Sequence, residues 1–178
     1  TVVPDVVIYE GRAGWDCFQE TGSPLPEETL ALAKRCGAVL FNGAASPSYP
    51  VDGYFVPGVH LRRELQTFAN IRPTRYMPVP TAREHVDVLV IRENTEDLYV
   101  GHEHTEDEGR TGISEKVITR AATERVAHLA YRLAIKSGRK RVTIVHKASV
   151  LTQTDGLFRK VALEVGAQYP EITTDELL

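Results

Sequence analysis

A run of aliphatic residues that ends in a dense polar cluster constrains the fold of this chain more than any other feature. Residues 86–91 read Val-Asp-Val-Leu-Val-Ile, and a short apolar run rich in β-branched residues predicts a buried strand. The polar cluster follows at once and contains Arg92, Glu93, Asn94, Thr95, Glu96, Asp97 and Tyr99. In α/β proteins ligand sites are usually built where strands end. A strand followed by a solvated acidic turn is the plainer interpretation, and composition alone favours it.

Arginines near the cluster favour an anion site. Arg92 carries a planar, permanently charged fork that suits a carboxylate or phosphate, and Tyr99 can give or take a proton. Further arginines precede the cluster at positions 62, 63, 72 and 75.

The first part of the chain predicts a parallel strand–helix–strand unit. Residues 6–9 and 38–41 have the composition of short strands. Between them, Pro26 followed by two glutamates predicts a helix start, and Gly37 predicts its end. Alternating strands and helices favour an α/β fold with parallel strands.

Later elements follow from the same patterns. The sequence predicts helices over 61–68, over 119–137 and after Asp155, extended segments at 70–73 and 141–146, and a last strand entered near 171. Two extended segments, 98–104 and 113–118, flank a polar loop and predict an exposed hairpin arm. A two-stranded arm is marginal alone and usually leans on a partner.

Composition excludes some classes of function. The 178 residues carry a net charge of −3, which gives no basic excess for nucleic acid. No apolar run is long enough to span a bilayer, and residues 1–4 lack the basic start and long apolar segment of a signal peptide, so we expect none. Cys17 and Cys36 form no ligand pattern and fit a reduced protein, so we expect a cytoplasmic location and no membrane partner. Neither standard nucleotide-binding loop is present.

Several single residues admit two interpretations. Ser46 follows a predicted strand and is a candidate ligand contact, although a serine before proline is more often a turn residue. Lys147 directly follows a predicted buried strand, where burial could lower its pKa and make it a base; a surface lysine at a turn is about as probable. His102 and His104 share a strand face and could bind metal, but no third ligand is evident, which favours solvated residues.

Three segments together resemble a known family. They are Leu61-Arg-Arg-Glu-Leu with Phe68-Ala-Asn-Ile-Arg72-Pro, then Arg92-Glu-Asn-Thr-Glu-Asp-Leu-Tyr99, then His146-Lys147-Ala-Ser-Val-Leu. Their order and spacing resemble the β-decarboxylating dehydrogenases, which include isocitrate, 3-isopropylmalate, homoisocitrate and tartrate or D-malate dehydrogenases. The homoisocitrate branch is the most similar, because the isopropylmalate branch usually has leucine where Asn94 stands and aspartate where His146 stands.

The resemblance implies a fold and a reaction. The fold would be that of isopropylmalate dehydrogenase, with two domains and mixed or parallel sheets. Residues 1–67 would belong to the large α/β domain and 68–178 to the small domain, whose hairpin at about 98–118 would be a dimer clasp. The activity would be the NAD- or NADP-dependent oxidation of a small di- or tricarboxylic 2-hydroxy acid, with Mg²⁺ or Mn²⁺, followed by loss of the β-carboxylate. The protein would be a homodimer or a higher homo-oligomer with shared active sites.

The resemblance also assigns roles to residues. Arg62, Arg72 and Arg92 match three arginines that grip the malate core of the substrate. Lys147 matches the lysine that accepts the hydroxyl proton in the partner's active site, and Tyr99 matches the tyrosine that protonates the enol. Ser46 matches a residue at the contact between substrate and nicotinamide.

Departures from the family pattern leave parts of this assignment open. Ser149 stands where the family has asparagine, so the cofactor contact there is in doubt. Gly58 and Val59 lie in the turn that reads the variable substituent, and a bacterial homoisocitrate type has arginine where Val59 stands. The family's first strand, its metal-binding aspartates and its adenine loop are not in this sequence. We therefore expect a chain truncated at both ends, with the metal ligands beyond Leu178.

A non-catalytic regulatory subunit or truncated relative is the rival hypothesis. Changes such as Ser149 and Val59 would suit such a protein. The presence of all three arginines, the tyrosine and the lysine favours the enzyme.

Overall fold

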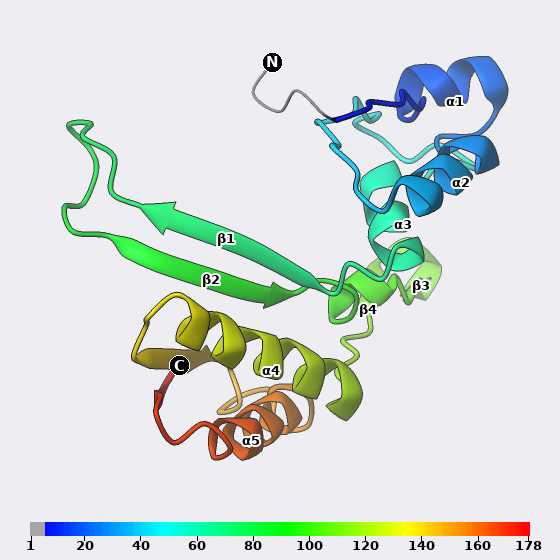
Figure 1. The fold of residues 1–178 in the computed structure, drawn as a ribbon. Coiled ribbons are helices and arrows are strands. Elements are labelled where there is room, and N and C mark those ends of the chain that lie inside the picture. The colour runs from blue at the N-terminus through cyan, green and yellow to red at the C-terminus, as the bar shows by residue number, and fades with distance from the viewer. Residues whose placement is uncertain (1–5) are drawn as a thin grey trace. The chain divides into compact units, whose positions relative to one another are not determined.

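The computed structural model describes residues 6–178, which divide into two units, one that ends at Thr67 and one that spans Phe68–Leu178. Their helices and strands are drawn in Figure 1. The assignment of these units to the large and small domains of a dehydrogenase stays a prediction. Among residues 6–178, no helix combines the length and the apolar character needed to cross a bilayer.

The first unit contains three helices, α1 (Trp15–Thr21), α2 (Glu27–Cys36) and α3 (Pro57–Glu64). The predicted start and stop of α2 are confirmed, since Pro26 precedes it and Gly37 ends it with a left-handed φ of 70°. Helix α3 differs from the predicted 61–68. It begins earlier because Pro57 supplies a preset φ for the first turn, and it ends earlier because Gln66 has a φ of 53°. Leu25, Ala33 and Leu61 form the core of this unit.

The two strands predicted in the first unit are not formed in the described residues. Residues 6–9 and 38–41 belong to no strand of the described chain, and Val7 and Ile8 are 72% and 79% exposed. A strand exists only through hydrogen bonds to a neighbour, and the described chain supplies none for either segment. The prediction of a parallel unit in this part of the chain was wrong.

Three two-stranded sheets make up the strands of the second unit. Strands β1 (Ala69–Arg75) and β2 (Asp87–Glu93) pair antiparallel, as do β3 (Glu103–Glu106) and β4 (Thr111–Ser114). Strands β5 (Arg141–Val145) and β6 (Thr173–Leu177) pair in parallel across helix α5 (Thr154–Gly166). The strand–helix–strand unit therefore occurs at the end of the chain, and the predicted α/β fold with parallel strands is confirmed.

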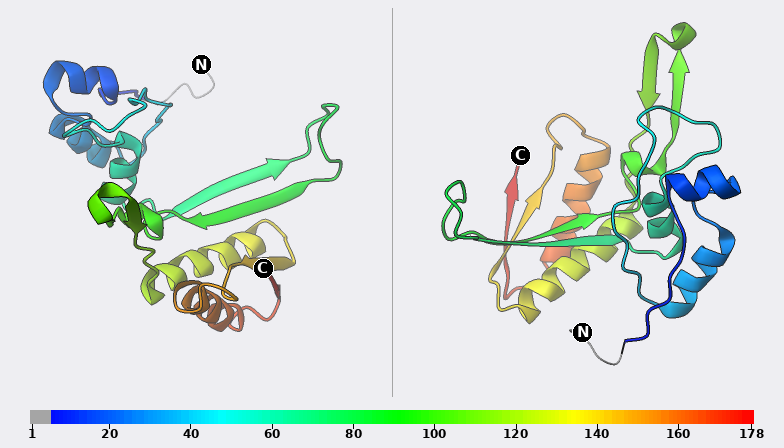
Figure 2. Two further views of the ribbon diagram at one scale, coloured as in Figure 1. Left: turned by 180° about the vertical axis from the view of Figure 1, so that it is seen from behind. Right: turned by 90° about the horizontal axis from the view of Figure 1, so that it is seen from above.

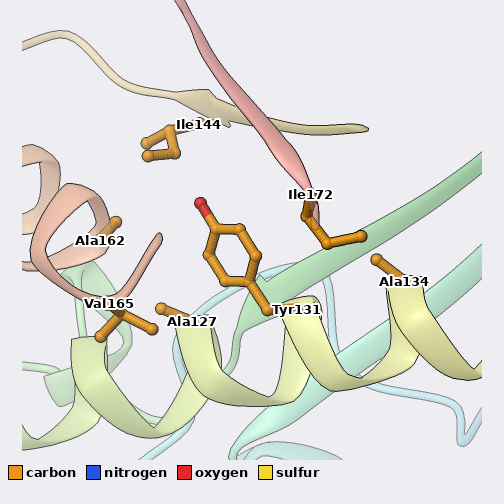
Figure 3. Packing of buried hydrophobic residues seen from close by; sticks show 7 residues of the cluster. All are labelled: Ala127, Tyr131, Ala134, Ile144, Ala162, Val165 and Ile172. Atoms are coloured by element: carbon orange, nitrogen blue, oxygen red, sulfur yellow. The ribbon is translucent and has the colours of Figure 1, made fainter. Parts of the chain in front are cut away.

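Helix α4 (Arg120–Lys136) packs against β2 and α5. The predicted bounds are confirmed, since Thr119 is the N-cap and accepts a hydrogen bond from the Ala122 N–H at 3.2 Å, and Ser137 is the C-cap. Tyr131 projects from α4 into the space between Ile144, Ala162, Val165 and Ile172, and its side chain is 1% exposed (Figure 3). Its hydroxyl is hydrogen-bonded to Thr174 Oγ1 at 2.8 Å, so one residue joins α4 to β6.

The predicted hairpin arm is present but shorter than expected. Strands β3 and β4 are four residues each, and the first part of the predicted extended segment is the 3₁₀ turn η1 (Leu98–Val100). Every residue of β3 is exposed, and the arm stands out from the rest of its unit in the view from above (Figure 2).

The two glycines of α5 predict opposite effects of alanine. At Gly166 an added Cβ would lie 2.5 Å from the Tyr131 hydroxyl and 2.9 Å from Thr174 Oγ1, whereas at Gly156 it would meet nothing within 4 Å. We expect Gly166→Ala to lower the free energy of unfolding by about 1–3 kcal/mol through overpacking. The matched control Gly156→Ala should raise it by about 0.5–1 kcal/mol through helix propensity. Chemical denaturation of both variants measures this, and equal signs would contradict the packing described for Tyr131.

Candidate active site

Two of the three predicted site arginines, Arg72 and Arg92, lie on the open face of the β1–β2 ribbon. Asn70 lies directly opposite Arg92, and Arg72 lies opposite Val90, so the three polar side chains share one face. Arg72 Nε donates to Asn70 Oδ1 at 3.0 Å. The alternate residues Leu89 and Ile91 are half-buried, on the strand that α4 packs against. The sequence predicted a buried strand here, but β2 is covered on one face only and Val88 and Val90 are exposed.

Tyr99 lies next to this face in the η1 turn. The Arg92 guanidinium lies over its ring, 5.0 Å from the ring centroid. Asp97 starts the turn, and its side chain accepts a hydrogen bond from the Leu98 N–H at 2.9 Å. The structure thus brings Arg72, Arg92 and Tyr99 together on one part of the second unit.

Two glutamates, for which no role was predicted, hold the loop that links Arg92 to Tyr99. The Glu93 carboxylate accepts hydrogen bonds from the Thr95 N–H at 2.7 Å, the Thr95 hydroxyl at 2.6 Å and the Glu96 N–H at 2.8 Å. Glu96 accepts from the Thr119 N–H at 2.8 Å and from its hydroxyl at 2.5 Å. The loop is therefore anchored to the start of α4.

Lys147 lies at the end of β5 with its backbone held on two sides. Its N–H donates to Asp155 Oδ1 at 2.7 Å, and the next N–H, of Ala148, donates to His146 Nδ1 at 3.1 Å. Because Nδ1 accepts, the His146 proton is placed on Nε2, which faces Glu176 Oε1 at 3.2 Å. The Lys147 side chain is exposed, so the buried environment suggested from the sequence is absent in the described residues. Ser149, the predicted cofactor contact, is also exposed.

Asp155 is a buried carboxylate with a shifted pKa. The sequence predicted it as a helix cap, but Gln153 occupies the cap position and Asp155 instead binds Lys147 N and the Lys116 ammonium, at 2.6 Å from Nζ. Burial acts to raise the pKa of Asp155, but the Lys116 ammonium and the Lys147 N–H outweigh it and hold that pKa below the ordinary aspartate value.

The first unit contains a cavity of about 460 Å³, and the four predicted site residues of this unit line it. Ser46, Gly58, Val59 and Arg62 all line it. The rest of the wall is mostly apolar and includes Val39, Phe41, Val56, Pro57, Leu61 and Leu65. Ser46 Oγ is hydrogen-bonded to the Tyr54 hydroxyl at 2.9 Å, which fixes its position.

The second unit contains a larger cavity of about 840 Å³ among β2, α4, β5 and α5. Its wall includes Arg92, Asp97, Lys116 and Asp155 beside the apolar side chains of the strands. Arg72, Tyr99 and Lys147 do not line it. The structure therefore places Arg92 at both the ribbon face and this cavity.

The described residues do not supply a set of metal ligands. Within residues 6–178 no group of three or more His, Cys, Asp or Glu side chains could hold a metal ion. His102 Nδ1 lies 3.3 Å from Glu115 Oε2 and His104 Nε2 lies 3.4 Å from Glu106 Oε1, so each histidine faces a single carboxylate.

Comparison with known proteins gives the family. Residues 4–178 match the family described as isocitrate/isopropylmalate dehydrogenase. The chain belongs to this family. It is 40% identical over 171 residues to the isocitrate/homoisocitrate dehydrogenase of Thermus thermophilus, which covers 96% of this chain and 51% of that protein. It is 44% identical over 163 residues to the 3-isopropylmalate dehydrogenase of Archaeoglobus fulgidus, covering 90% and 47%.

Solved structures agree with this membership. The isocitrate dehydrogenase of Methylococcus capsulatus aligns with a TM-score of 0.86 and 34% identity, over 93% of this chain and 49% of that one. The chain thus spans about half the length of the relatives that it matches. The isocitrate/isopropylmalate dehydrogenase fold expected from the sequence is confirmed.

The shifted pKa of Asp155 predicts a pH dependence of stability. Because its folded pKa lies below the unfolded value of about 3.9, its contribution is present above that pH and is lost as pH falls through the folded pKa. We expect Asp155→Asn to be less stable than the wild type at pH 7, with a difference that shrinks below about pH 4. Denaturation midpoints between pH 7 and 2.5 measure this. Asp52→Asn, in an exposed loop, is the control, and a difference independent of pH at Asp155 would contradict the ion pair.

Proposed function

We propose that the protein containing this chain is an NAD(P)-dependent β-decarboxylating dehydrogenase that acts on a 3-substituted malate. The observation that carries the proposal is the shared face of Arg72 and Arg92, with Tyr99 stacked against Arg92. Family membership supports it, since relatives are named isocitrate, homoisocitrate and 3-isopropylmalate dehydrogenases.

The arginines would orient the substrate. Two carboxylates on adjacent carbons need fixed cations that never lose their proton, and guanidinium forks bind carboxylates through two parallel hydrogen bonds. Arg72 and Arg92 would hold the malate core, and Arg62 would add a third guanidinium. With the substrate held in this way, its C2–H bond can be aligned with the hydride acceptor. Such alignment can supply a large part of an enzyme's rate enhancement.

Tyr99 and Lys147 would move the protons. As the hydride leaves C2, the 2-hydroxyl proton passes to Lys147, directly or through one water molecule, and a 2-oxo acid forms. Loss of the β-carboxylate as CO₂ leaves an enol, and the Tyr99 hydroxyl would donate a proton to C3. The exposed Lys147 side chain and the half-exposed Tyr99 are both accessible to a ligand.

Cofactor and partner assignments follow from family membership alone. NAD or NADP would accept the hydride, with Ser46 and Ser149 as proposed contacts. The metal does not fit the described residues, which offer no ligand cluster, so no step is assigned to it here. A homodimer through the β3–β4 arm is proposed because a two-stranded arm with an entirely exposed first strand gains stability from a partner.

Turnover by the full-length protein tests the proposal. We expect reduction of NAD⁺ or NADP⁺ with Mg²⁺ or Mn²⁺ on at least one of homoisocitrate, isocitrate, 3-isopropylmalate and D-malate. Arg92→Gln should lower kcat/KM about tenfold to a hundredfold through lost charged hydrogen bonds, and Tyr99→Phe should lower kcat by about a hundredfold or more. Arg83→Gln, in an exposed loop, is the control.

No turnover of any substrate would contradict the proposal. Binding of the same acids without turnover, measured by calorimetry, would favour the regulatory subunit.

A substrate with an apolar 3-substituent is the second candidate, favoured by the cavity of the first unit. Among the described residues that line it, Arg62 is the single cation, beside a wall of aliphatic and aromatic side chains. A distal carboxylate such as that of homoisocitrate would need a second cation, since burying an unpaired charge is costly. An alkyl group would instead gain from burial against Val59 and Phe41.

Val59→Arg tests this choice. With an apolar substituent preferred, the wild type should favour 3-isopropylmalate over homoisocitrate in kcat/KM. Val59→Arg should then shift this ratio toward homoisocitrate by about tenfold or more, the value of one charged hydrogen bond. Val59→Leu, which adds volume without charge, is the matched control and should not favour the longer acid. A wild-type preference for homoisocitrate would exclude the apolar assignment.

A further inference from the structure

Lys116 occupies a position that neither the sequence motifs nor the proposed mechanism uses. It lies between β4 and α4, and its side chain is 25% exposed. Its ammonium group faces two carboxylates from distant segments, Asp155 Oδ2 at 2.6 Å and Asp97 Oδ1 at 3.8 Å. A single half-buried cation is thus shared by the two segments that carry the proposed catalytic groups.

Through Asp155, Lys116 is connected to the backbone of Lys147. The same Asp155 carboxylate that binds Lys116 through Oδ2 accepts the Lys147 N–H through Oδ1 at 2.7 Å. Asp155 is 8% exposed, so without Lys116 a buried carboxylate would lose its counter-charge. It would then move toward solvent or become protonated, and the start of the Lys147 turn would move with it.

Through Asp97, Lys116 is connected to the turn that contains Tyr99. Asp97 has a φ of 68° and a ψ of −141°, a backbone region that glycine prefers. Such a conformation persists only where surrounding contacts hold it. Asp97 is held by a two-way backbone bridge to Val117, with N–H to O distances of 2.9 and 3.5 Å, and its carbonyl also accepts from the Val100 N–H at 3.5 Å. Its side chain caps Leu98 N and lies near the Lys116 ammonium. Asp97 starts the turn in which Tyr99 lies.

We propose that Lys116 is a positioning residue that holds the Tyr99 turn and the Lys147 backbone in a single arrangement through Asp97 and Asp155. The inference rests on the proposed function for its kinetic consequence, but the mechanical link between the two segments stands on the contacts alone. An ordinary structural ion pair would stabilise the fold without affecting both segments in the same way. Loss of such an ion pair would change the unfolding temperature, but it would not lower amide protection at Leu98 and Lys147 together.

The test uses the full-length protein with Lys116→Met, Lys116→Arg and the control Lys160→Met, which removes an exposed lysine of α5. Amide hydrogen exchange at Leu98 and Lys147 is measured beside kcat and KM. We expect Lys116→Met to lower protection at both amides together and to lower kcat about tenfold to a hundredfold with little change in KM. Lys116→Arg, which keeps the charge, should restore most of both losses, and Lys160→Met should alter neither.

Two results would overturn the inference. One is a loss of protection at only one of the two amides in Lys116→Met, and the other is a kcat within about twofold of an active wild type. If the wild type turns over no substrate, the proposed function fails, and the paired amide measurement still decides the link. If Lys116→Met does not fold, Lys116→Gln takes the same measurements, because it removes the charge while it keeps a hydrogen-bond donor.

Discussion

The anchoring of α4 to the end of β2 is the constraint on which the second unit depends. Thr119 caps the helix, and the same residue donates two hydrogen bonds to Glu96, three residues after the strand ends. The helix start therefore cannot move without moving the loop that contains Glu96. Glu93 closes that loop from its other end, with three hydrogen bonds from Thr95 and Glu96. Core packing along α4 thus orders a polar loop at the surface, and Arg92 and Tyr99 lie on either side of it.

Elements set by local patterns could be predicted from the sequence. The apolar spacing of α4, its threonine cap, and the proline and glycine at the ends of α2 all act within a few residues, so a single sequence contains the whole signal. The strand at 141–146 and the helix after Asp155 were predicted for the same reason, whereas the parallel pairing of β5 with β6 is known only from the structure. The predicted site residues Arg72, Arg92 and Tyr99 lie near one another because they stand on two paired strands and the adjoining turn.

Features that depend on distant partners could not be predicted. Residues 6–9 and 38–41 have strand composition, but pairing is a property of two segments, and neither finds a partner in the described chain. Asp155 was predicted to cap a helix, but it lies in the first turn of α5 and binds a lysine 39 residues away. Nothing in the sequence around Lys116 marks it, because its role arises from two carboxylates that the fold brings to it. The Glu96–Thr119 contact spans 23 residues and was missed for the same reason.

The register of the β1–β2 ribbon decides which side chains can meet a ligand. Successive residues of a strand point to opposite faces, so the alternation that turns Leu89 and Ile91 toward α4 also turns Arg92 and Val90 outward. A slip of one residue would bury the guanidinium against the helix and expose the aliphatic side chains. Burial of an unpaired guanidinium is costly, so the packing against α4 strongly disfavours that register. The hydrophobic contact that stabilises the strand therefore also keeps two like charges on one open face, where an anion with two carboxylates would relieve their repulsion.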